Sequence, residues 1–167
     1  MKKIYLLALA VIGFSANSFA QSNVAATTAS ATIVAPISIN KVTDMNFGNV
    51  AVQNATAGTV ILAPAGTRTK TGGVSLPATL GTVTAASFTV TGEGIYTYAI
   101  TLPTVDVTLI SGGNSMIVNT FTSLPSATGA LTGGTQTLNV GATLNVSAAQ
   151  AAGVYLSPSF NVTVNYN

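Results

Sequence analysis

Few side chains in this sequence could carry acid–base or metal chemistry. The chain holds five Lys or Arg, three Asp or Glu, no His and no Cys. Beyond residue 20, the charged residues are Lys41, Asp44, Arg68, Lys70, Glu93 and Asp106. Enzymes commonly take a general base, a thiolate nucleophile or a metal ligand from His, Cys and clustered carboxylates. The composition therefore argues against an enzyme.

The three carboxylates form no motif for chemistry. Asp44 lies in a predicted turn, Glu93 at the tip of a predicted hairpin, and Asp106 alternates with two valines, so we expect it to face solvent. A calcium site or a glycosidase pair needs two or more converging carboxylates. Segment 68–73 is basic and glycine-rich but carries only two charges, and we interpret it as an ordinary loop. We expect no catalytic residue, no cofactor and no metal site.

Residues 1–20 have the pattern of a secretory signal peptide. Two lysines precede an apolar run over residues 4–14, and small residues precede a cleavage position between Ala20 and Gln21. The run is shorter than the roughly 20 residues that span a bilayer, and no later stretch is long enough. We expect an exported protein without a transmembrane segment in its mature chain, located in the periplasm in transit and then at the cell surface or outside the cell.

The mature chain would be almost neutral. With residues 1–20 removed, three basic and three acidic side chains remain. So balanced a chain offers no basic patch for nucleic acid or for an anionic membrane. Its length is sufficient to bury one core without disulfides, although export would permit them.

Apolar and polar residues alternate along most of the chain, which predicts β-strands. At the C-terminus, Phe160, Val162, Val164 and Tyr166 share one face of such a strand. Residues 138–146 alternate without a break through Gly141, which favours one long strand over a hairpin that turns there. Further strands are expected over 29–39, 58–63, 88–90, 96–102, 105–109 and 116–121.

Short strands separated by Gly and Pro predict an all-β fold, an antiparallel β-sandwich. We assign the sandwich to residues 31–167 as a single domain. Residues 21–30 are small and polar and read as an extended N-terminal segment. Thr and Asn occupy many outward positions, where the β-branch of Thr suits a half-exposed pleated surface.

Two sequence elements resemble a known group of proteins. Asp44, Phe47 and Gly48 form a D-Φ-x-F-G turn shortly after the first strand, and a G-x-Y at 153–155 precedes V-T-V-N-Y at 162–166. In this order they resemble the spore-coat-protein-U-like and archaic chaperone–usher pilin domains of Gram-negative bacteria. The closer resemblance is to an exported bacterial family of unknown function related to those pilins.

The resemblance implies an immunoglobulin-like, Greek-key sandwich that lacks one strand. It also implies partners, namely a periplasmic chaperone, an outer-membrane usher, and copies of the chain or related subunits. The N-terminal extension of one subunit would fill the gap in the next by β-augmentation. The candidate donor residues are Ala25, Thr27, Ala29, Ala31 and Ile33, and the candidate acceptor edge is formed by Phe160, Val162, Val164 and Tyr166.

Two functions follow from the sequence. In the first, the protein is a pilin-like structural subunit that assembles into a fibre or coat by strand exchange. In the second, residues 25–34 pair within their own subunit. The protein is then a monomeric surface or matrix domain that binds a glycan or a protein partner.

Overall fold

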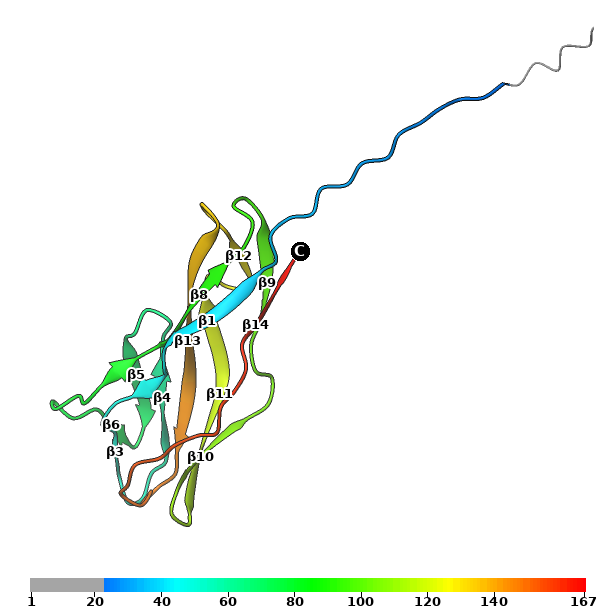
Figure 1. Ribbon diagram of the computed structural model, residues 1–167. Coiled ribbons are helices and arrows are strands. Elements are labelled where there is room, and N and C mark those ends of the chain that lie inside the picture. Colours follow the sequence, from blue (N-terminus) through cyan, green and yellow to red (C-terminus); the bar gives the residue numbers. More distant parts are fainter. Residues whose placement is uncertain (1–22) are drawn as a thin grey trace, which may run out of the picture. The chain divides into compact units, whose positions relative to one another are not determined.

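The computed structural model describes residues 23–167, which contain strands and no helix (Figure 1). The all-β, antiparallel, sandwich-like fold predicted from the sequence is confirmed. The predicted signal peptide, with its cleavage position between Ala20 and Gln21, lies outside the described residues.

The strands are short except for two in the second half of the chain. They are β1 (Ser38–Thr43), β2 (Asn46–Phe47), β3 (Ala51–Val52), β4 (Gly58–Leu62), β5 (Arg68–Gly72), β6 (Val74–Ser75), β7 (Val83–Thr84), β8 (Ala86–Thr91), β9 (Thr97–Thr101), β10 (Val107–Ser111), β11 (Asn114–Leu124), β12 (Thr128–Ala130), β13 (Thr135–Val146) and β14 (Thr163–Tyr166).

The main sheet has the order β1-β8-β13-β11-β10, and β4 also pairs with β13 and carries β5 on its outer side. A second sheet has the order β12-β9-β14, and two small sheets pair β2 with β7 and β3 with β6. Every pairing is antiparallel. The second sheet covers one half of the main sheet, and the small sheets cover the other half.

Strand β13 is one long strand, as the unbroken alternation predicted. It pairs with β8 as far as Val140 and with β4 from Ala142 onward. Gly141 stands where the partner changes, and a Cβ at this position would collide with the backbone carbonyl of Leu62. Gly141 therefore allows the backbone of β4 to lie close to β13, and it does not form a turn.

The core consists of two apolar clusters. One is centred on β4 and the second half of β13 and contains Phe47, Val60, Leu62, Val74, Val107, Val118, Ala142, Leu144 and Val146. The other lies between the first half of β13, β8, β9 and β14 and contains Ala86, Val90, Tyr98, Leu131, Leu138, Val140 and Val164. The half-buried Met45 and Phe121 pack against both clusters and join them.

Two secondary-structure predictions are wrong. The strand expected over 29–39 begins only at Ser38, because Pro36 lacks the N–H that a ladder needs and the residues before it present no strong apolar face. Segment 68–73, interpreted as a loop, contains β5, which pairs with β4. Both faces of β5 are polar. An edge strand tolerates this, and charged side chains are common on such edges.

The described chain divides into two units, residues 23–33 and Val34–Asn167. Residues 23–33, here called the arm, contain no strand, and their side chains are exposed. Val24 is 83% exposed and Ile33 is 95% exposed. The arm therefore carries exposed apolar side chains.

Candidate functional site

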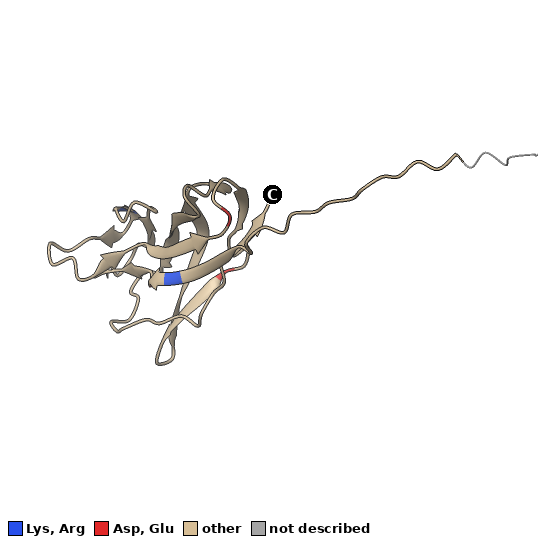
Figure 2. Cartoon of the chain, turned by 45° about the horizontal axis from the view of Figure 1, so that its top comes forward, with Lys and Arg blue, Asp and Glu red and all other residues tan. Residues whose placement is uncertain are grey.

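The charged side chains do not converge on a catalytic or metal-binding site. In residues 23–167, no group of three or more His, Cys, Asp or Glu side chains is arranged to hold a metal ion. Lys41 and Asp44 form an exposed ion pair with an N–O distance of 2.6 Å. Figure 2 shows the charged residues as a few short coloured segments along an otherwise uncharged ribbon. No helix among the described residues is long and apolar enough to cross a membrane.

Strand β14 has a free edge. It pairs with β9 along one side, and the described ladders include none along its other side. The amide of Asn167 donates to the carbonyl of Thr97, which sets the odd-numbered residues of β14 as those bonded to β9. Because bonding alternates along an antiparallel strand, the backbone groups of Val164 and Tyr166 point to the free side.

Strand β1 has a free edge on the same side of the sandwich. Among residues 23–167 it pairs with β8 alone, and it approaches β14 without a ladder between them (Figure 1). Ser38 pairs with Thr91 and Tyr166 with Tyr98, at the two ends of the β8–β9 connection, so β1 and β14 run in opposite directions. We call the two free edges together the β1/β14 side. Strand edges without partners are sites for strand addition.

The chain before β14 is unpaired for a reason that the sequence contains. Ile110 and Leu156 exchange two backbone hydrogen bonds of 2.8 and 3.0 Å. Extending that register places Thr108 opposite Pro158 at the next hydrogen-bonded position. From the other end, Thr101 pairs with Thr163, and the same extension places Pro103 opposite Asn161.

Each proline thus lies where the ladder needs an N–H that proline lacks. In the described chain, no backbone–backbone hydrogen bond involves residues 157–162. The two segments separate between the ends of the ladder, over residues 102–109 and 157–162, and leave what we call the proline opening.

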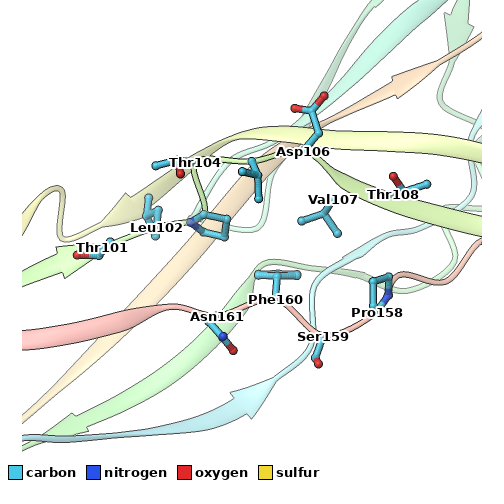
Figure 3. Close-up of a pocket in the computed structure, with 12 residues that line it drawn as sticks. Thr101, Leu102, Thr104, Asp106, Val107, Thr108, Pro158, Ser159, Phe160 and Asn161 are labelled. Carbon is cyan, nitrogen blue, oxygen red and sulfur yellow. The ribbon is translucent and has the colours of Figure 1, made fainter.

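The proline opening holds a pocket of about 550 Å³. Val107 and Phe160 face one another across it, and Asp106 points away (Figure 3). Phe160 also packs on Phe121 with ring centroids 5.2 Å apart. Leu102, Pro103, Val105 and Pro158 add to the apolar part of the lining, and Thr, Ser and Asn residues make up the rest, so that Asp106 is the one charged residue of the pocket.

The first residues of the second unit are fixed at one end of the β1/β14 side. The hydroxyl of Tyr166 donates to the carbonyl of Ala35 at 2.9 Å and accepts from the amide of Glu93 at 2.6 Å. The amide of Ala35 donates to the Glu93 carboxylate at 3.3 Å. Both backbone polar groups of Ala35 are therefore occupied, and we call this arrangement the Ala35 clamp.

The D-Φ-x-F-G turn has a structural role. Gly48 has a φ of 67° and lies against the Leu80 carbonyl and Arg68, where a side chain would not fit. Arg68 donates to the carbonyls of Phe47, Asn49 and Leu80. The backbone carbonyl of Asp44 accepts a hydrogen bond of 2.8 Å from Thr84. Sequence reasoning found the turn but missed Arg68, which is distant from it in the chain.

The other predicted residues lie as follows. Val164 is buried, Phe160, Val162 and Tyr166 are half-buried, and only Val164 and Tyr166 belong to β14 itself. The candidate donor residues Ala25, Thr27, Ala29, Ala31 and Ile33 are all exposed in the arm. The Ala35 clamp was not anticipated, because its three residues are scattered over the sequence.

Comparison with known proteins gives one family. The pattern of a family described as "Domain of unknown function (DUF4402)" matches residues 37–166. No curated protein and no solved structure matches the chain significantly.

Proposed function

Because the chain belongs to the DUF4402 family of domains of unknown function, we propose a function from its geometry. The protein is an exported structural subunit that assembles into a fibre or coat by β-strand exchange. The arm of one copy adds as a strand to the β1/β14 side of another. The observation that carries this proposal is that the described part of one chain contains both an arm that forms no ladder and two neighbouring strand edges that have none.

Backbone hydrogen bonds would supply most of the binding energy. Each bond formed on strand addition contributes about 0.5–1.5 kcal/mol net. Ala25, Ala29 and Ala31 bury little apolar area compared with Leu or Ile, each of which contributes roughly 1.5–3 kcal/mol when fully buried. Ile33 is the largest side chain of the candidate donor face. The exchange therefore depends on the number of ladder bonds more than on deep side-chain pockets.

The surface composition supports self-association. Like charges that would repel neighbouring copies are rare, since three basic and three acidic side chains lie beyond residue 20. Designed soluble monomers usually carry about 25–35% charged residues on their surface. The sequence resemblance to chaperone–usher pilins supports a periplasmic chaperone and an outer-membrane usher as assembly partners, and a final location at the cell surface.

The experiment is a denaturing gel of the purified exported protein, run without heating. Strand-exchanged subunits should appear as a ladder that collapses to one band on boiling. Deletion of the arm should abolish the ladder. An unheated protein that migrates as a single monomer band, and that melts at the same temperature with and without the arm, would contradict the proposal.

A matched pair of arm variants tests the mechanism. Ala29→Pro removes one backbone N–H and fixes φ in the middle of the arm, so it should weaken or abolish the ladder. Ala29→Ser changes the same exposed side chain but keeps the N–H, and its ladder should match that of the wild type. Equal ladders from both variants would show that the arm does not pair as a strand.

The proline opening supports a second candidate function. The lining includes the aromatic ring of Phe160 and several uncharged polar residues, among them Asn161, and such a lining suits an uncharged ligand such as a glycan. In this alternative the protein is a monomeric surface domain. A glycan array in which Asn161→Ala removes the signal would favour it, and an array without signal would count against it.

A further inference from the structure

We propose that the junction between the arm and the β-sandwich keeps the arm out of its own β1/β14 side, so that the occupant of that side is the arm of a second copy. Given the strand exchange proposed above, the Ala35 clamp and the chemistry of residues 34–37 decide between pairing within one copy and pairing between copies.

The first step concerns direction. Strand β1 starts at Ser38, at the Tyr166 end of β14, and runs along the β1/β14 side away from that end. Residues before Ser38 therefore reach this side only if the chain reverses between the arm and β1. A strand formed in this way would be the first strand of a hairpin with β1.

The second step concerns the turn that such a hairpin needs. Tight hairpins use turns with positive φ at their central residues, typically Asn-Gly, Asp-Gly or Gly-X. The available residues are Val34, Ala35, Pro36 and Ile37, none of which favours positive φ. Pro36 fixes its own φ near −65° and holds Ala35 in an extended conformation. The junction is therefore a poor hairpin turn.

The third step concerns the contacts that hold the junction. The carbonyl of Ala35 accepts from the Tyr166 hydroxyl at 2.9 Å, and its amide donates to Glu93 at 3.3 Å. A reversal at Ala35 would give up these bonds and would also disturb the hydroxyl that accepts from the Glu93 amide. The Ala35 clamp thus connects the residues that follow the arm to β14. It opposes a reversal of the chain between the arm and β1.

The experiment installs the missing turn. Ala35→Asn combined with Pro36→Gly supplies a type I′ sequence in the full exported chain and removes the proline. We expect the unheated gel to lose its ladder and the protein to run as a monomer. This monomer should melt at a higher temperature than the arm-deleted protein, because its own arm now fills the β1/β14 side. The matched control is Pro36→Ala, which supplies no residue that favours positive φ and should keep the ladder.

The outcomes separate this inference from the proposed function. A ladder that persists unchanged in the variant with Ala35→Asn and Pro36→Gly would overturn the inference and leave strand exchange standing. The inference would also be overturned if this double variant were monomeric but melted at the same temperature as the arm-deleted protein, because its arm would then fill no gap. A monomeric wild-type protein would overturn both the inference and the proposed function. If its melting temperature is higher than that of the arm-deleted protein, the arm already pairs within its own copy. If the two melting temperatures are equal, the arm pairs nowhere.

Discussion

At the scale of single residues, Arg68 shows how a charged side chain can serve a backbone turn rather than a reaction. Its guanidinium donates to three carbonyls, those of Phe47, Asn49 and Leu80, and no carboxylate bonds to it among the described residues. Arginine suits this role because its planar group presents several donors in a fixed geometry, which lysine does not. The D-Φ-x-F-G turn and its cation form one structural unit.

Replacing Arg68 by Met should destabilise the fold. The change leaves three carbonyls without their donor, and we expect a loss of about 1–3 kcal/mol in the free energy of unfolding. Urea denaturation followed by circular dichroism measures it. Lys70→Met, at an exposed position on the same strand, is the control and should lie within about 0.5 kcal/mol of the wild type. Equal losses for both variants would show that Arg68 does not support the turn.

Tyr98 makes the free energy of unfolding depend on pH in the alkaline range. Its ring is buried and its hydroxyl donates to Gln136 at 2.8 Å, and burial raises the pKa of Tyr98 above its ordinary value of 10.0. The folded state therefore holds the proton more tightly than the unfolded state. The resulting stability is fully present below pH 10.0 and decreases as pH rises toward and through the folded-state pKa.

We expect the urea midpoint of the wild type to fall more steeply above pH 10.0 than that of Tyr98→Phe. The variant should lose about 1 kcal/mol at neutral pH with the hydrogen bond, but it should lack the steep alkaline decrease. Tyr155→Phe, which removes a half-buried hydroxyl bonded to Gln150, is the control. Parallel alkaline curves for the wild type and Tyr98→Phe would contradict the assignment.

At the scale of elements, two prolines decide where the C-terminal ladder stops. The segments around Ile110 and Leu156, and around Thr101 and Thr163, pair in almost the same register, yet the chain between them does not pair. The cause is the missing N–H at Pro103 and Pro158, and the result is a pocket rather than a continuous sheet. The opening is therefore a consequence of primary structure at two positions.

Pro158→Ala should extend the ladder by one hydrogen-bonded pair. The amide that this variant gains faces the carbonyl of Thr108, so we expect it to exchange its hydrogen slowly, as measured by NMR. The net change in stability should be small, because a bond of about 0.5–1.5 kcal/mol is offset by the lost rigidity of proline. Pro77→Ala, in a loop, is the control and should give a rapidly exchanging amide. Fast exchange of the new amide in Pro158→Ala would contradict the register.

At the scale of the whole molecule, stability depends very little on charge. The one ion pair in the described residues joins Lys41 to Asp44, and both side chains are exposed. Exposed pairs contribute about 0–1 kcal/mol and are screened by salt. Burial of apolar faces and ladder hydrogen bonds must therefore hold the fold, and the same backbone bonds would hold the proposed assembly.

The urea midpoint and the unheated gel ladder should both change little between low and high sodium chloride. Screening removes few attractions or repulsions from a chain with so few charges. Sodium chloride is the appropriate salt, because sulfate would strengthen apolar burial by a different route. A ladder that dissolves at high sodium chloride would indicate that charged contacts, rather than strand exchange, join the copies.

The sequence by itself determined the class of fold and the faces of its clearest strands. Side chains alternate across a strand, so the inward sets of β13 and β14 could be read from local periodicity. It also predicted an extended segment over residues 21–30, but it began the following strand at residue 29, whereas β1 begins at Ser38. It misassigned β5 because an edge strand with two polar faces shows no alternation until its partner β4 is known.

Only the tertiary structure decided which edges remain open and what surrounds them. That β1 and β14 present free edges on one side, that Arg68 binds the turn at Gly48, and that Tyr166 and Glu93 hold Ala35 all depend on residues far apart in the chain. Local patterns describe the faces of a strand, because they follow from backbone geometry at each residue. The neighbours of a strand edge depend on long-range pairing, which no local pattern contains.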